Sequence, residues 1–279
     1  MSVDAPTIVA SADGTSIASY RAGTGPVVIL VDAALSTHEQ SRRLGALLEP
    51  RFTVVRYDRR GRAGSGDVAP GAADPAREVE DLAAVITANG GSAILFGSSS
   101  GAALALEAAA HLGDRVAGLV LYEPPFIVDD SRPPVPRDLP ERIASEVVAG
   151  RRGRALALFL REAMSIPAVG VAAMRLTSNW AAGKRLVHTL GYDFAALAGT
   201  QDGRPLPRER WGGITARGVV MAGERSEPFF HDAARALSEL LPRITYRSLE
   251  GGHHGSAVMS PGGIAAVFDE LWASPTASA

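Results

Sequence analysis

Short apolar runs alternate with stretches of helical spacing along most of this chain. Several runs, such as residues 27–31 and 116–122, are continuous and rich in β-branched residues, which is typical of strands buried on both faces. Strands that alternate with helices predict βαβ units joined by right-handed crossovers. We therefore predict a mostly parallel, eight-stranded sheet flanked by helices, with strands at residues 7–10, 16–20, 27–31, 52–57, 92–96, 116–122, 217–222 and 244–249.

One long segment breaks this alternation. Residues 128–207 are helical in spacing throughout, and proline-rich stretches bound them at both ends. We predict a helical cap over this segment, inserted into an α/β core formed by residues 1–127 and 208–279. Within the core, helices are predicted at residues 37–48, 74–89, 102–110, 229–241 and 261–272.

The composition describes an ordinary globular protein and narrows the chemistry. The chain has 279 residues, of which 46% are hydrophobic and 21% charged, with a net charge of −2 and no cysteine. Without cysteine there are no disulfides, thiolate metal sites or cysteine nucleophiles. The small net charge gives no electrostatic basis for binding nucleic acid or an anionic membrane. Residues 1–6 do not resemble a signal peptide, and no apolar stretch is long enough to span a bilayer, so we expect a cytoplasmic enzyme. The sequence leaves open whether the chain forms a homodimer.

The stretch at residues 97–101 carries the clearest chemical signal. It reads Gly-Ser-Ser-Ser-Gly, follows an apolar strand and precedes an alanine-rich helix. A strand, G-x-S-x-G and a helix form the nucleophile-elbow pattern, in which the sharp turn exposes the central serine, here Ser99. The alternative interpretation is a Gly/Ser turn without a catalytic role.

The chain resembles α/β-hydrolase fold proteins that carry a cap. The resemblance rests on residues 97–101, on the strand and loop at 31–34, on the loop at 57–62 and on residues 251–254, and it covers nearly the whole chain outside the cap. It implies an α/β-hydrolase fold and acyl-transfer chemistry that needs neither a cofactor nor a metal. In this fold, the loop rich in arginine at 57–62 is more often structural than functional.

The resemblance places the catalytic base in the loop after the last strand. That loop contains His253 and His254, and the usual spacing favours His254. A serine hydroxyl needs such a base because free serine is a weak nucleophile.

The acid that orients the histidine is expected at one of two places in this fold. After the penultimate strand, Ser226 stands where an aspartate is usual. After the strand that follows the elbow helix, Glu123 precedes two prolines and is well placed to reach the histidine. We therefore favour Glu123, while Glu224, Glu227 and Asp232 stay open.

The oxyanion hole needs two backbone amides directed at the substrate oxygen. One is expected from Ser100 and the other from Ala33 or Ala34, in the loop after residue 31. Most relatives have His-Gly in this loop, whereas this chain has Asp32-Ala33. A helix N-cap role for Asp32 is as well supported as a direct role in catalysis.

The chain is similar to zearalenone-type lactone hydrolases, which carry a Ser-His-Glu triad. This similarity rests on three features together: Asp32, the serine-rich elbow and Glu123. The similarity implies that an apolar small-molecule ester or lactone is cleaved through an acyl-enzyme. C–C bond hydrolysis, thioester hydrolysis and a non-catalytic ligand-binding role are alternatives. Five further residues are candidates for the substrate pocket: Asp32, Leu35, Trp180, His188 and Tyr192.

Overall fold

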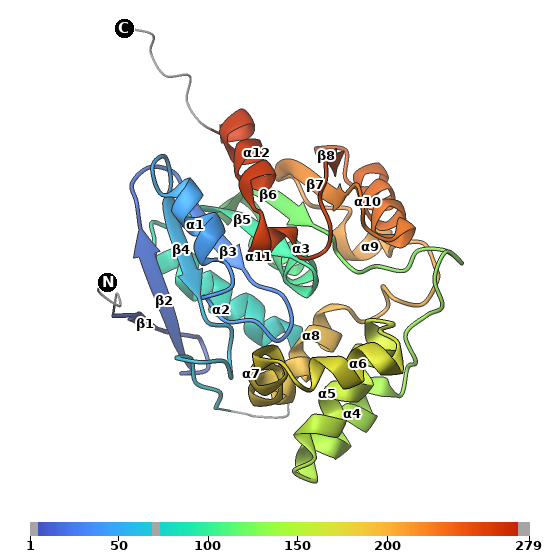
Figure 1. The fold of residues 1–279 in the computed structure, drawn as a ribbon. Coiled ribbons are helices and arrows are strands. Elements are labelled where there is room, and N and C mark those ends of the chain that lie inside the picture. The colour runs from blue at the N-terminus through green and yellow to red at the C-terminus, as the bar shows by residue number, and fades with distance from the viewer. Residues whose placement is uncertain (1–4, 69–72, 273–279) are drawn as a thin grey trace, which may run out of the picture.

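A computed structural model describes residues 5–68 and 73–272 of the chain, so the N-terminal stretch at residues 1–4 lies outside the described residues (Figure 1). Eight strands form a single sheet in the order β1-β2-β4-β3-β5-β6-β7-β8. The β1–β2 and β2–β4 pairs are antiparallel, and every pair from β4 to β8 is parallel. The predicted mostly parallel sheet is confirmed. The strands are β1 (Thr7–Ala10), β2 (Ser16–Ala22), β3 (Val27–Val31), β4 (Thr53–Tyr57), β5 (Ala93–Ser98), β6 (Val116–Tyr122), β7 (Arg217–Gly223) and β8 (Ile244–Leu249).

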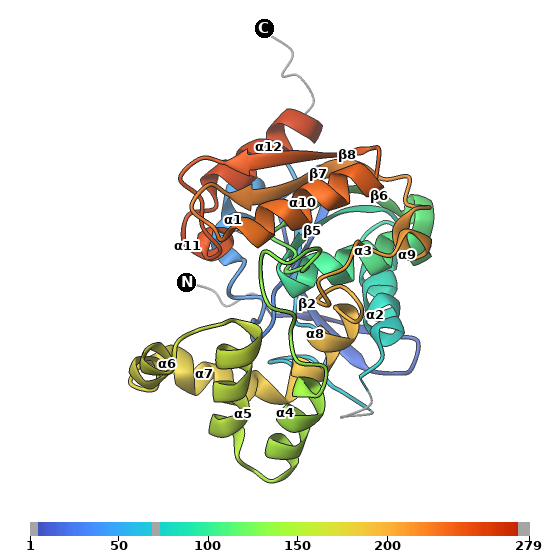
Figure 2. The same ribbon diagram turned by 90° about the vertical axis from the view of Figure 1, so that its right-hand side faces the viewer.

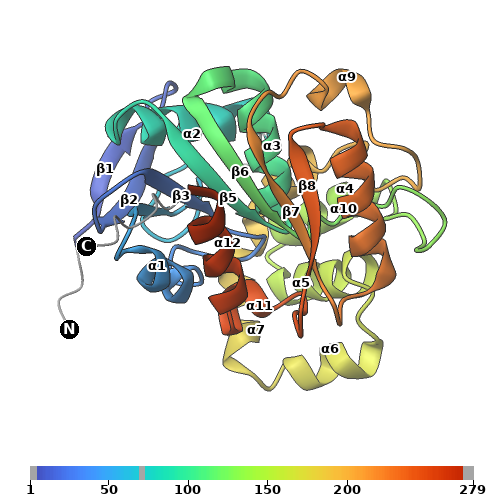
Figure 3. The same ribbon diagram turned by 90° about the horizontal axis from the view of Figure 1, so that it is seen from above.

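Helices cover both faces of the sheet (Figure 3). One face packs against α2 (Pro75–Ala88), α3 (Ser100–Leu112) and α10 (Pro228–Leu240), which share a core with side chains from the central strands. The opposite face packs against α1 (Arg42–Leu48) and α12 (Gly262–Trp272). Because both faces are buried, the central strands are continuous apolar runs rather than alternating ones.

Between β6 and β7 the chain forms a group of helices that lies outside the sheet and the helices on its two faces (Figures 1 and 2). They share a hydrophobic core of their own, and α8 also packs against α3 of the α/β core. We call α4 to α8, with the π-helical turn η2, the cap helices. They are α4 (Leu139–Val148), α5 (Arg152–Leu158), η2 (Phe159–Ala163), α6 (Ala168–Met174), α7 (Ser178–Leu186) and α8 (Leu190–Ala196). The domain boundaries at residues 128 and 207 stay a prediction.

Some helix boundaries differ from the prediction. The helix expected at residues 37–48 begins at Arg42, because the residues before it form a turn in which the Thr37 amide donates to the Gln40 side chain. The prediction did not include three short helices: α9 (Arg208–Trp211), α11 (Ser256–Met259) and the 3₁₀ helix η1 (Gly113–Arg115). Within the cap, a second 3₁₀ helix, η3 (Val187–Thr189), joins α7 to α8. No helix of the described residues is long and apolar enough to cross a membrane.

Candidate active site

Ser99 lies at a sharp turn between β5 and α3. Its backbone has φ 54° and ψ −124°, a strained conformation for a residue with a side chain. A Cβ atom at Gly97 would lie 2.5 Å from the Cα of Ala102, and one at Gly101 would lie 2.2 Å from the carbonyl oxygen of Val31. Neither position can hold a side chain without backbone movement. The two glycines therefore allow the turn that presents Ser99 at the start of α3.

Glu123 follows β6 and is fully buried. Its Oε2 lies 2.7 Å from Nδ1 of His254, while its Oε1 accepts hydrogen bonds from the amide of Gly223, at 2.6 Å, and from the hydroxyl of Ser226. Burial alone raises the pKa of the Glu123 carboxyl, but these hydrogen bonds outweigh it and hold the pKa below its usual value. Glu123 is therefore a carboxylate at neutral pH, positioned to orient His254.

The hydrogen bond from Ser226 explains a departure noted in the sequence. Ser226 stands where the resemblance implies an aspartate, and its hydroxyl donates a hydrogen bond to Glu123 Oε1. The two possible acid positions therefore meet at one point in space. Two of the other candidate acids have different partners. Glu224 accepts a hydrogen bond from the amide of Gly251, and Asp232 forms an ion pair with Arg235 on the surface.

The structure brings His254, and not His253, against Glu123. His253 is held in the preceding turn, where its carbonyl accepts the hydroxyl of Tyr122 at 2.7 Å and its Nδ1 accepts the amide of Gly255 at 3.1 Å. The ring of Phe230 stacks on His254 with a centroid distance of 4.7 Å. This stacking and the bond to Glu123 fix the orientation of the imidazole.

Ser99 and His254 line the same cavity, which has a volume of about 240 Å³ and lies between the sheet and the cap helices. The hydrogen bonds of the described residues join His254 to Glu123 but not to Ser99, and catalytic hydrogen bonds of this kind are often long before substrate binds. Ser100 and Ala34 also line the cavity, whereas the carbonyl of Ala33 is turned to Arg62 at 2.7 Å. The apolar lining consists of Ala34, Pro125, Phe159, Ala163, Met164, Ile166, Phe194, Leu197, Phe229 and Phe230.

The five residues expected at the substrate pocket do not line this cavity, so that assignment is corrected: Asp32, Leu35, Trp180, His188 and Tyr192. Trp180 and Leu35 pack in the hydrophobic core of the cap helices instead. Helical spacing identifies an apolar side chain, but it does not say whether that side chain faces a core or a pocket.

Tyr192 and His188 are directed elsewhere by polar partners. The hydroxyl of Tyr192 donates to Asp67 at 3.0 Å, and Nε2 of His188 lies 3.1 Å from the carbonyl oxygen of Gly61. Successive residues of an α-helix are separated by about 100°. The two residues that follow Tyr192 on α8, Asp193 and Phe194, line the cavity in its place.

Asp193 joins the cap to the core through a buried ion-pair network. Its two carboxylate oxygens bind Arg59 at 2.7 Å and Arg62 at 2.8 Å, and Arg59 also pairs with Glu78 at 2.6 Å. The hydroxyl of Ser100 donates to Asp193 Oδ1 at 2.8 Å. Burial raises the pKa of Asp193, yet the arginines and Ser100 hold it below its usual value. The arginine loop is therefore structural, as expected, and the network fixes the residue next to Ser99.

Sequence reasoning missed Asp193 and several other residues of the cavity. A carboxylate within the apolar run at residues 190–197 was an available signal, because a buried charge requires a partner. No comparable signal marked the polar lining residues Arg132 and Gln201, and Glu227 was a candidate only for the acid. The first two lie in loops that flank the cap helices, and their position depends on tertiary packing.

Asp32 is almost fully buried, and its Oδ2 accepts a hydrogen bond from the hydroxyl of Ser41 at 2.8 Å. Ser41 is the residue before α1, so Asp32 holds the start of this helix through a side chain and does not cap it through its amides. Burial raises the pKa of Asp32 to about 7, although Ser41, Arg62 and Arg59 act against this rise.

This raised pKa predicts a pH-dependent gain in stability for Asp32→Asn. The folded protein binds the Asp32 proton more tightly than the unfolded chain, whose carboxyl has a pKa near 3.8. The free energy of unfolding of the wild type therefore falls as pH rises from about 4 to 7 and then levels. Asparagine at position 32 carries no charge, so it avoids this loss, and its side-chain oxygen can still accept the hydrogen bond from Ser41. The free energy of unfolding of the variant should therefore exceed that of the wild type by up to about 4 kcal/mol above pH 7. Urea unfolding at pH 5 and pH 8 tests this, and a difference between the proteins that does not grow with pH would contradict it.

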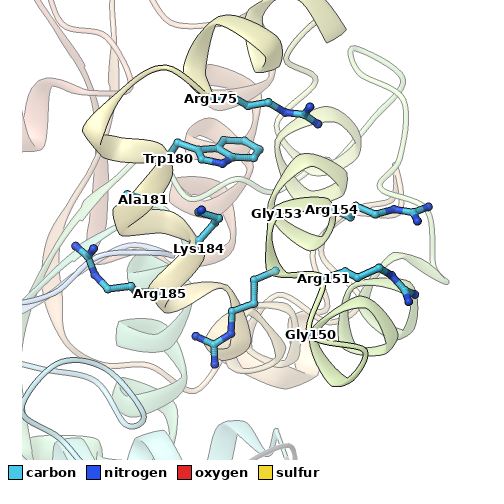
Figure 4. A pocket seen from close by; sticks show the side chains of 10 residues that line it. Gly150, Arg151, Gly153, Arg154, Arg175, Trp180, Ala181, Lys184 and Arg185 are labelled. Carbon is cyan, nitrogen blue, oxygen red and sulfur yellow. The ribbon is translucent and has the colours of Figure 1, made fainter.

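A second hollow lies on the cap, between α5 and α7, and has a volume of about 820 Å³ (Figure 4). Its lining is strongly basic, but it contains neither Ser99 nor His254. The side chain of Arg185 extends to the opposite side from those of Arg151 and Arg154, so the cations do not converge on one point (Figure 4). Within residues 5–68 and 73–272, no group of three or more His, Cys, Asp or Glu side chains is arranged to hold a metal ion.

Comparison with known proteins gives consistent matches. Residues 24–267 match the Alpha/beta hydrolase family. An alpha/beta hydrolase from Sphaerobacter thermophilus DSM 20745 is 42% identical, with a TM-score of 0.86 over 95% of this chain and 99% of that chain. None of the curated proteins matches the chain in sequence.

Two more distant structures share the fold. A thermophilic esterase from Thermogutta terrifontis, with malate bound, is 19% identical, with a TM-score of 0.72 over 95% of this chain and 97% of that one. The enol-lactonase from Burkholderia xenovorans LB400 is 17% identical, with a TM-score of 0.71 over 95% and 98%. At these identities the likeness concerns the fold alone.

Proposed function

The chain belongs to the α/β-hydrolase family, and from this premise we propose that it is a serine hydrolase that cleaves a carboxylic ester or lactone without a cofactor. The observation that carries the proposal is the His254–Glu123 pair, with 2.7 Å between Nδ1 and Oε2, whose imidazole opens into the cavity lined by Ser99. A buried carboxylate, an imidazole and a serine at an elbow are the three groups that acyl transfer requires.

In the proposed reaction, Ser99 Oγ attacks the substrate carbonyl while Nε2 of His254 takes the hydroxyl proton. Glu123 accepts the Nδ1–H of His254, so that the correct tautomer is kept and the imidazolium is stabilised. The C–O bond to the leaving group then breaks, and His254 returns the proton to the leaving alkoxide. Water, activated by His254, hydrolyses the acyl-enzyme.

The oxyanion hole is assigned to the amides of Ser100 and Ala34. Ser100 is the first residue of α3, where the backbone amides and the positive end of the helix dipole favour negative charge. Ala34 is preferred to Ala33 because it lines the cavity. The hydrogen bond between Ser100 Oγ and Asp193 supports this assignment by holding the first turn of α3 in place.

The cavity supports a small substrate with an apolar part. Its lining is mostly aliphatic and aromatic, and its volume of about 240 Å³ is below the usual range for ligand pockets. Lactones are included because a Ser-His-Glu arrangement resembles that of zearalenone-type lactone hydrolases, and because an enol-lactonase shares the fold. The small volume favours compact lactones over macrolactones.

We expect the purified protein to hydrolyse p-nitrophenyl acetate and butyrate, and to prefer them to p-nitrophenyl dodecanoate by at least about tenfold in kcat/KM, because the cavity cannot enclose a long acyl chain. Release of p-nitrophenolate at 405 nm gives the rates. His253→Asn is the matched control, since this residue neighbours His254 but is held in a turn by its own backbone and ring contacts. If no ester or small lactone is turned over, the hydrolase proposal fails.

A further inference from the structure

Arg132 introduces a positive charge into an otherwise mostly apolar cavity. It lies in the loop between β6 and α4, and it is the one Arg or Lys among the described residues that line the cavity of Ser99. Its guanidinium carbon lies 4.5 Å from the centre of the Phe229 ring, and Nη2 donates to the carbonyl of Ala163 and the hydroxyl of Ser165, each at 2.7 Å. These contacts fix the guanidinium in one place.

Most of the hydrogen-bonding capacity of Arg132 is unused. The hydrogen bonds of the described residues occupy Nη2 and leave Nε and Nη1 for another partner. Among the described residues, no carboxylate lies within ion-pair distance of Arg132. The buried Arg59, Arg60 and Arg62 of the core, by contrast, each pair with at least one. A half-buried guanidinium without an anion is costly.

Burial lowers the pKa of Arg132, and the charge of Glu227 acts in the opposite direction without a direct contact. Glu227 lines the cavity but is exposed, and it lies at the start of α10. An arginine side chain keeps its charge in proteins, so the guanidinium is a cation that no carboxylate of the described residues contacts directly.

We propose that the substrate carries a carboxylate which Arg132 binds while Ser99 attacks an ester or lactone carbonyl elsewhere in the same molecule. This inference rests on the proposed hydrolase function and refines its substrate class. A guanidinium binds a carboxylate through two parallel N–H···O bonds, which fix orientation as well as affinity. A dianion such as a phosphate monoester is disfavoured, because Asp193 and Glu227 line the same cavity.

A structural role for Arg132 predicts a different result. By binding Ala163 and Ser165, Arg132 fastens the end of η2 to Phe229 of the core. If this were its whole function, its replacement would disturb the cavity for charged and uncharged substrates alike. The comparison of a carboxylate substrate with its uncharged isostere separates the two roles.

The test uses the monoethyl esters of succinic, glutaric and adipic acid, each beside the corresponding ester in which the free carboxylate is a primary amide. For at least one chain length, we expect the wild type to prefer the carboxylate substrate to its amide by about 10- to 100-fold in kcat/KM. This factor corresponds to the usual contribution of a hydrogen bond to a charged group. Arg132→Gln should abolish this preference, mainly through KM, so that the acid and the amide of each length are hydrolysed with kcat/KM values within about threefold of each other. Arg132→Lys should retain part of the preference, because lysine keeps the positive charge but cannot form the two parallel N–H···O bonds of a guanidinium.

Arg137→Gln is the matched control, since Arg137 lies in the same loop but is exposed and pairs with Asp202. Equal rates on acid and amide at every length, or an equal loss on both in Arg132→Gln, would overturn the inference. If p-nitrophenyl esters are hydrolysed in such a case, the proposed function stands and this inference alone fails. If no ester of any kind is hydrolysed, both fail.

Discussion

Ser99→Ala is expected to lower kcat for p-nitrophenyl butyrate by at least about 10⁴-fold, because it removes the atom that forms the acyl-enzyme. The remaining activity should come from the oxyanion hole and substrate binding alone. The fold should persist, since no hydrogen bond within residues 5–68 and 73–272 depends on Ser99 Oγ. The backbone of the elbow is held instead by the Ser99 amide, which donates to the carbonyl oxygen of Tyr122 at 2.9 Å. Stopped assays at high enzyme concentration give the residual rate, and circular dichroism gives the melting temperature.

Ser98→Ala is the control for this experiment. Ser98 neighbours Ser99 and ends β5, but it does not line the cavity. It should keep activity within a few-fold of the wild type. A Ser99→Ala protein that keeps more than about a tenth of the wild-type rate would exclude Ser99 as nucleophile.

Glu123→Gln is expected to lower kcat by about 10³- to 10⁴-fold, because the amide can donate to Nδ1 of His254 and so stabilise the wrong tautomer. Substrate affinity should change little, since Glu123 lies behind the imidazole and does not line the cavity. Glu123→Ala should lose a similar factor in rate and also stability, because the amide of Gly223 and the hydroxyl of Ser226 lose their acceptor. Steady-state kinetics with p-nitrophenyl butyrate separate kcat from KM.

Two variants serve as controls for the acid. Glu224→Gln and Asp232→Asn change carboxylates that the sequence left open but that the structure places against Gly251 and Arg235, so both should stay near the wild-type rate. The double variant Glu123→Ala/Ser226→Asp should recover at least about tenfold over Glu123→Ala, because the side chain of residue 226 already reaches Glu123 Oε1. A near-normal rate for Glu123→Gln would transfer the role of the acid to another residue.

The sequence predicted those features that depend on local backbone geometry. The elbow follows from two glycines and a serine at fixed spacing, and the close approaches at Gly97 and Gly101 show why these two positions cannot hold a side chain. The eight strands were found because buried parallel strands are continuous apolar runs. The resemblance to α/β-hydrolases favoured His254 as base and Glu123 as acid, and these two side chains lie 2.7 Å apart, while their catalytic roles stay a prediction.

The wall of the cavity was not predicted, because it depends on how the cap helices pack. Trp180 and Phe159 are both aromatic residues of the cap, and only their tertiary positions separate a core residue from a pocket residue. Phe159 begins the π-helical turn η2, which changes the direction of the side chains that follow. Arg132 lies in a proline-rich loop without periodicity, so nothing in its neighbours indicated that it lines the same cavity as Ser99.

The central claim is that Ser99 is a nucleophile activated by His254 and Glu123, and covalent labelling tests it most directly. The wild type is incubated with a fluorophosphonate, and the modified peptide is identified by mass spectrometry. We predict one adduct per chain on Ser99, absent in Ser99→Ala and formed at least about 10²-fold more slowly in Glu123→Gln. An unlabelled wild-type protein, or an adduct on any other residue, would contradict the claim.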